Sequence, residues 1–60
     1  MELLIRHADD SEHQYGSVKL AEQQYKPNDN VSGIQIEYTN GSDDFIEDGE
    51  ILGVYLAGIV

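Results

Sequence analysis

The chain has 60 residues and no cysteine, and its 12 acidic and three basic residues give a net charge of −9 at pH 7. A chain of this length forms at most one domain and buries only about 60% of the surface that its unfolded form exposes, so its stability needs support. The absence of cysteine excludes disulfides and thiolate metal sites as that support. We therefore expect one domain, residues 1–60, that gains stability by forming a homodimer.

The negative charge is uneven, and this decides which partners suit the chain. Residues 1–26 carry five acids and three bases, whereas residues 27–60 carry seven acids and no base. Such a surface repels the phosphates of nucleic acid and the headgroups of anionic lipids, and it attracts basic proteins. We therefore expect no direct nucleic-acid binding and no membrane binding. The first residues do not match a signal peptide, which predicts a cytoplasmic location.

The first half of the chain predicts a strand followed by a helix or an irregular segment. An apolar run predicts the strand over residues 2–8. Ser11 and Gln14 then match a capping box, and apolar residues at spacings of three and four predict a helix over residues 11–25. Gly16 disfavours that helix by about 1 kcal/mol relative to alanine, so a strand remains an alternative for this segment. Pro27 and the Asn and Asp residues after it predict a turn.

The second half of the chain predicts a β-meander. Apolar and polar residues alternate over residues 34–39, which indicates a half-buried strand. Asn40-Gly41 is typical of a type I′ hairpin turn, and the chain would return as a strand over residues 43–47. Asp48-Gly49 predicts a second tight turn by the same mechanism. The apolar run over residues 51–59 predicts a last strand that is buried on both faces or at a subunit contact.

Together these elements predict a fold that is α+β or mostly β. The C-terminal three-stranded meander would form a small antiparallel sheet that the N-terminal strand completes beside the C-terminal strand, with at most one short helix on one face. The other face, or a free sheet edge, then needs cover, which a second copy would provide. The predicted dimer interface consists of apolar residues of the last strand: Leu52, Val54, Leu56 and Ile59.

No pattern in the chain predicts catalysis or a bound metal. The paired carboxylates lie in or beside predicted turns, where water screens them, whereas a catalytic pair needs contrasting environments inside a pocket. An EF-hand loop aligned on Gly49 lacks oxygen ligands at Ile46 and Tyr55. His7 and His13 share no motif, and we expect them to be surface or partly buried residues. We therefore expect no enzymatic activity, no catalytic residue, no metal and no cofactor.

The segment from Glu37 to Glu50, EYTNGSDDFIEDGE, contains six of the chain's 12 acidic residues and no base. One interpretation is that these charges only solvate the sheet and prevent aggregation at its edges. The other is a docking surface for a basic protein, with fast and salt-sensitive association. The predicted partner-binding residues are Glu37, Asp43, Asp44, Glu47, Asp48 and Glu50, with Asp9, Asp10 and Glu12 as a second patch.

In its length, its charge and the run DDFIEDGE, the chain resembles small acidic inhibitors that bacteriophages make against host proteins. Some of these inhibitors are DNA mimics, including one that occupies the DNA-binding site of the nucleoid protein HU. The chain matches no motif of such proteins, so no residue role is carried over. The resemblance implies a non-enzymatic inhibitor that acts in the bacterial host cytoplasm and occludes the nucleic-acid-binding surface of a basic host protein. The alternative is an assembly module whose apolar C-terminal strand is the functional surface, with acids that only provide solubility.

Overall fold

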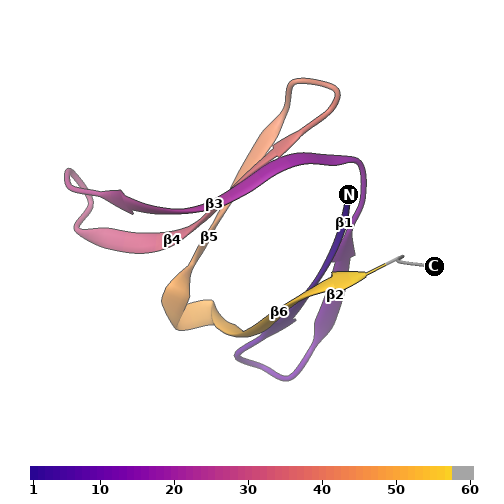
Figure 1. Cartoon of the computed structure of the whole chain (residues 1–60). Coiled ribbons are helices and arrows are strands. Elements are labelled where there is room, and N and C mark those ends of the chain that lie inside the picture. Colours follow the sequence, from indigo (N-terminus) through magenta and orange to yellow (C-terminus); the bar gives the residue numbers. More distant parts are fainter. Residues whose placement is uncertain (58–60) are drawn as a thin grey trace.

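The computed structural model describes residues 1–57. Within these residues it contains six strands and one 3-10 helix: β1 (Glu2–His7), β2 (Glu12–Tyr15), β3 (Val18–Lys26), β4 (Val31–Tyr38), β5 (Asp43–Glu47), η1 (Asp48–Glu50) and β6 (Ile51–Ala57). The strands form two antiparallel sheets, ordered β2-β1-β6 and β3-β4-β5 (Figure 1). The prediction of a small, mostly β, antiparallel fold is confirmed. The described residues contain no helix long and apolar enough to cross a membrane.

Of the two alternatives for residues 11–25, the strand is confirmed and the helix is wrong, because these residues form β2 and most of β3. β3 pairs with β4 along its length, and this pairing satisfies the backbone groups on the edge of β3 that faces β4. Ser17, between β2 and β3, has a φ of 57°, which is a left-handed conformation foreign to an α-helix. The Ser11 carbonyl accepts a 2.8 Å hydrogen bond from the His7 amide, so Ser11 belongs to the β1–β2 hairpin and does not begin a helix. Strand pairing therefore outweighs the local capping signal at Ser11.

Ser17 also marks the corner at which the chain passes from one sheet to the other. β2 ends before this corner in one sheet, and β3 begins after it in the second sheet (Figure 1). Met1 and Val18 are joined by backbone hydrogen bonds of 3.0 Å in both directions. The Ser17 carbonyl accepts a further 2.9 Å bond from the amide of Thr39. These bonds hold the two sheets together at this side, so that they enclose one core.

The predicted hairpin of β4 and β5 is confirmed, but its turn is of another type. Gly41 has a φ of 89°, whereas Asn40 lacks the positive φ that a type I′ turn requires at both central residues. The Asn40 Oδ1 atom instead accepts hydrogen bonds from the Ser42 amide, at 2.9 Å, and from the Ser42 hydroxyl, at 2.6 Å. These bonds fix the loop and thereby the register of the two strands.

The last strand pairs with only one of its two predicted neighbours. Residues 48–50 form η1 instead of a tight turn at Asp48-Gly49, and the Glu50 carbonyl accepts a 2.9 Å hydrogen bond from the Ala8 amide. β6 therefore pairs with β1 and not with β5, so the predicted C-terminal three-stranded meander does not form. The predicted pairing of the N-terminal strand with the C-terminal strand is confirmed, with Leu3 opposite Leu56.

The core is small and lies between the two sheets. Its buried side chains come from four strands: Leu3, Ile5, Val18, Ile36 and Ile46. Gly33 allows β5 to pack closely on β4, because a Cβ atom at this position would clash with the Ile46 carbonyl oxygen and lie 2.8 Å from the Phe45 ring. The alternation of side chains along β4 and β5, with Ile36 and Ile46 buried, determines which side of these strands faces the core and where their acidic side chains point.

Candidate functional site

Four carboxylates share the outward side of the sheet β3-β4-β5. Because successive side chains of a strand point to opposite sides, the burial of Ile36 and Ile46 turns their neighbours outward. Cross-strand partners share a side as well: Glu37 stands opposite Asp43, and Glu22 stands opposite Gln35. We name this surface the acidic face, and its exposed carboxylates are those of Glu22, Glu37, Asp43 and Glu47.

Glu37 and Asp43 are cross-strand neighbours of like charge. Such neighbours have Cα atoms about 4.5–5.5 Å apart, and their repulsion destabilises a sheet. No ion pair offsets this repulsion, because the one ion pair within residues 1–57 joins Arg6 and Asp10, 3.3 Å apart, in the β1–β2 hairpin. The hydrogen bonds on the acidic face come from side-chain amides. Gln35 donates one to Asp43 and Gln24 donates one to Glu22, both at 2.8 Å.

Lys26 lies at the far end of the acidic face and contacts an aromatic ring. Its Nζ atom is 3.9 Å from the centroid of the Phe45 ring, which is a cation–π contact. Lys26 stands opposite Val31, at the end of β3 and β4 that is remote from Glu37. The basic group therefore secures the Phe45 ring and does not neutralise the like-charged pair.

Asp44 and Asp48 of the predicted set point away from the acidic face. Asp44 stands opposite the buried Ile36, on the core side of β5, and accepts a 2.6 Å hydrogen bond from the hydroxyl of Tyr38. Asp48 accepts hydrogen bonds of 2.9 and 3.2 Å from the side-chain amide of Gln23. The structure therefore does not bring the six predicted residues onto one surface.

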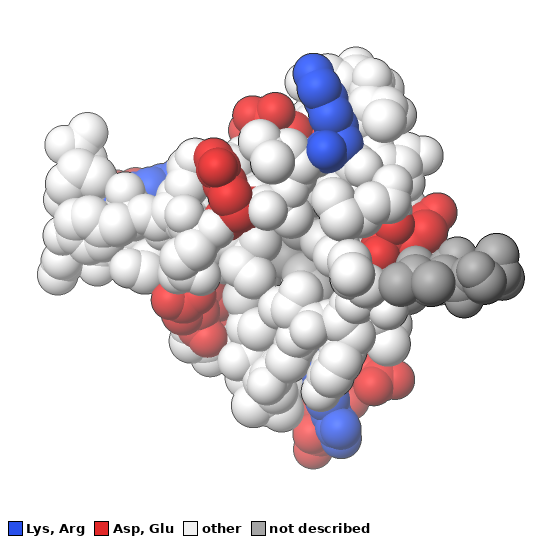
Figure 2. All heavy atoms as spheres, in the orientation of Figure 1, with Lys and Arg blue, Asp and Glu red and all other residues white. Residues whose placement is uncertain are grey.

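The acidic face includes one residue that the sequence interpretation missed. Glu22 is not among the partner-binding residues that the sequence predicts. The pairing of β3 with β4 places it on the same side as Glu37, because its partner Gln35 lies two residues before Glu37. Figure 2 shows the resulting charge distribution: in this view the acidic side chains form separate groups around the molecule, with largely uncharged surface between them.

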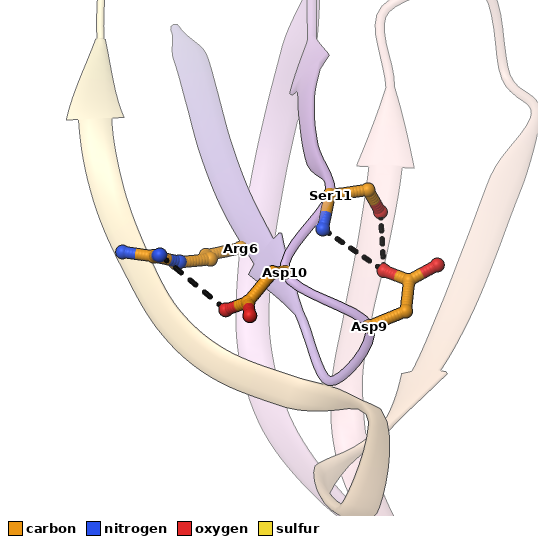
Figure 3. A network of polar contacts seen from close by, with 4 residues as sticks. All are labelled: Arg6, Asp9, Asp10 and Ser11. Carbon is orange, nitrogen blue, oxygen red and sulfur yellow. Dashed lines mark hydrogen bonds and ion pairs between the residues drawn. The ribbon is translucent and has the colours of Figure 1, made fainter.

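The predicted second patch occupies the turn between β1 and β2, in the other sheet (Figure 3). The Asp9 carboxylate accepts hydrogen bonds from the Ser11 hydroxyl, at 2.6 Å, and the Ser11 amide, at 3.0 Å, and these bonds lower the pKa of Asp9. Asp10 accepts a 3.3 Å hydrogen bond from Arg6, and Glu12 stands opposite Arg6 across the two strands. Asp9 therefore shapes the turn and Asp10 pairs with a cation, unlike the carboxylates of the acidic face.

His7 and His13, which no motif links, come together beside Tyr15. Their rings meet edge to face with centroids 4.9 Å apart, and the His7 Nε2 atom is 3.1 Å from the Tyr15 hydroxyl. A shallow hollow of about 290 Å³ adjoins them and is lined in part by Glu50. Burial raises the pKa of Tyr15, and the charges of Asp44 and Glu50 raise it further. Within residues 1–57, no group of three or more His, Asp or Glu side chains is placed to hold a metal ion.

Three of the four predicted dimer-interface residues are exposed on β6, namely Leu52, Val54 and Leu56. The fourth, Ile59, lies outside the described residues. The apolar run of the last strand is therefore not buried on both faces within one chain. Comparison of the chain with protein-family models, with curated proteins and with solved structures finds no match.

Proposed function

We propose that this protein is a non-enzymatic inhibitor that binds a basic, nucleic-acid-binding protein through its acidic face. The carboxylates of that face occupy the positions that phosphates would take, so that the partner no longer binds nucleic acid. The observation that carries the proposal is the pair of Glu37 and Asp43, two like charges on neighbouring strands, neither of which forms an ion pair within residues 1–57. Like charges on opposite residues lower the stability of the sheet, so the pair does not serve folding. Lysine or arginine side chains of a basic partner would offset this repulsion on binding.

The sheet holds these carboxylates in a fixed array. Neighbouring strands lie about 4.8 Å apart, and the four-residue separation of Asp43 and Glu47 along β5 corresponds to about 13 Å. The backbone register fixes this spacing before binding, which limits the entropy lost on association. A single exposed charge pair at 4 Å contributes only about 1 kcal/mol in water, so several pairs must form together. Association of this kind is fast and weakens steeply with salt.

The proposal includes the kind of partner and the place of action. A nucleoid protein of a bacterial host fits the required chemistry, because its DNA-binding surface is rich in lysine and arginine. The site of action is then the bacterial cytoplasm, and the resemblance to acidic bacteriophage inhibitors agrees with this assignment. Neither direct nucleic-acid binding nor membrane binding suits a chain with a net charge of −9.

Two variants with equal charge changes test the proposal. E37Q/D43N/E47Q removes three carboxylates from the acidic face, and D9N/D10N/E12Q removes three from the β1–β2 hairpin. Each protein is immobilised and exposed to bacterial lysate, bound proteins are eluted with a salt gradient, and they are identified by mass spectrometry. We expect the unmodified chain and the hairpin variant to capture a basic nucleic-acid-binding protein that duplex DNA displaces, and the face variant to lose it. Equal loss in both variants, or capture that neither salt nor DNA affects, would contradict the proposal.

A further inference from the structure

β6 has a free edge that lacks the usual protection against strand pairing. It pairs with β1 on one side only, so the backbone groups of its other edge have no partner strand within residues 1–57. Proteins commonly protect such edges with charged residues. β6 is the one strand among the described residues that contains no charged residue, whereas β2, β3 and β5, the other edge strands, all contain acids.

The side chains of β6 are apolar and exposed to an unusual extent. Among residues 1–57, seven large apolar side chains are exposed, and four of them belong to this strand: Leu52, Val54, Tyr55 and Leu56. Leu56 is 63% exposed and Leu52 is 59% exposed. Val54 and Leu56 also line a mainly apolar hollow of about 250 Å³ between the two sheets. Single exposed apolar residues are ordinary, but a continuous group along a free edge marks an interaction surface.

The sequence of β6 is complementary to itself in an antiparallel arrangement. When Val54 is placed on a two-fold axis, Leu52 faces Leu56 of the second copy, and Gly53 faces Tyr55. Each Tyr55 ring fills the space over Gly53 of its own chain, where an added Cβ atom would lie 2.6 Å from the Tyr55 hydroxyl. The side-chain contacts across the axis are therefore those of Leu52 with Leu56.

We propose that two copies of this chain associate through antiparallel pairing of their β6 strands, with Val54 on the two-fold axis. The two β2-β1-β6 sheets then form one continuous sheet, and the free edges satisfy each other. The charge distribution favours a second copy as the partner of β6. Two chains of net charge −9 repel each other, but β6 contains no charged residue, so pairing through β6 brings no like charges of this strand together. A basic partner would find no carboxylate on this strand. The acidic face lies on the other sheet, so this inference does not rest on the proposed function.

Three double variants and the unmodified chain test the proposal by sedimentation velocity over a range of concentrations. L52E/L56E and L52K/L56K place like charges opposite each other across the axis, and L52K/L56E places opposite charges there. We expect a dimer for the unmodified chain and for L52K/L56E, and loss of the dimer for the other two. Because L52K/L56K lowers the net negative charge, its loss of the dimer would show that the cross-strand contacts decide the outcome and that overall repulsion does not.

The proposal fails if the unmodified chain is a monomer up to millimolar concentration, or if L52K/L56E behaves like the two like-charged variants. Circular dichroism and thermal unfolding verify that each variant is folded, and these side chains are exposed enough to permit substitution. Added salt provides a second readout. It should strengthen the unmodified dimer by screening the repulsion between the acidic bodies, whereas it should weaken the L52K/L56E dimer relative to the unmodified one.

Discussion

Tyr38 donates a hydrogen bond of 2.6 Å to Asp44 across the β4–β5 hairpin. Burial of the ring, together with this bond to a carboxylate, raises the pKa of Tyr38 to about 12. The contact explains why Asp44, although part of the acidic run, does not belong to the acidic face. The Asp44 carboxylate instead accepts the Tyr38 hydrogen bond near the end of the hairpin, and its charge also helps to raise the pKa of Tyr15.

The Tyr38–Asp44 contact predicts a defined response to alkaline pH. Because burial of the ring and the bond to Asp44 hold the folded-state pKa of Tyr38 at about 12, above the ordinary value of 10.0, the stability that depends on protonated Tyr38 is fully present below pH 10 and is lost as the pH rises through 12. D44N removes the carboxylate charge, so we expect Tyr38 to ionise at lower pH. Titration of tyrosinate absorbance measures this, and Y38F identifies the contribution of Tyr38. Identical titration curves for D44N and the unmodified chain would contradict the assignment.

Gly33 is expected to tolerate no side chain. G33A places a Cβ atom against the Ile46 carbonyl oxygen and the Phe45 ring, so β5 must move. We expect this variant to lose about 1–3 kcal/mol of unfolding free energy, as overpacked sites do. The matched control is G49A, whose Cβ atom would meet no atom within 4 Å and whose φ is not positive. Urea unfolding of both variants measures the difference, and equal stability would refute the close approach of β5 at Gly33.

The like-charged pair of the acidic face is expected to reduce the stability of the fold. E37K places a cation opposite Asp43, which should raise the unfolding free energy by about 0.2–1 kcal/mol. E12K is the control, because it places a second cation opposite Arg6 and should lower the stability. Chemical unfolding at low and high salt measures both effects, and the difference should shrink as salt screens it. A destabilised E37K would mean that Glu37 contributes to folding and is not kept at the expense of stability.

Ser11 is expected to control the ionisation of Asp9. The hydroxyl and amide of Ser11 lower the pKa of Asp9, so S11A, which removes the hydroxyl, should raise it towards the ordinary value of 3.8. The stabilisation from these bonds is present above that value and is lost as the pH falls through the lowered pKa. S11T keeps a hydroxyl and should retain the lowered pKa. NMR titration of the Asp9 carboxyl carbon measures all three proteins, and an unchanged value in S11A would assign the effect to the backbone alone.

Part of the acidic face could be predicted from the sequence, and part could not. Alternation along β4 and β5 is a local property, so it separates Glu37, Asp43 and Glu47 from Asp44 once the hairpin register is known. Glu22 could not be added, because the spacing of apolar residues in residues 11–25 suited a helix as well as a strand. The contact between His7 and His13 likewise depends on the β1–β2 hairpin. The capping signal at Ser11 predicted the start of a helix at this place and not a hairpin.

Local sequence patterns were sufficient to predict the mostly β character of the second half, the β4–β5 hairpin and the uncharged, apolar last strand. These features depend on the alternation of side chains and on turn residues, which act between near neighbours in the chain. The strands over residues 12–15 and 18–26, and the pairing of β6 with β1 instead of β5, depend on contacts between distant segments of the chain. Such pairings join segments far apart in the chain, and their hydrogen bonds and shared core outweigh local preference where that preference is weak.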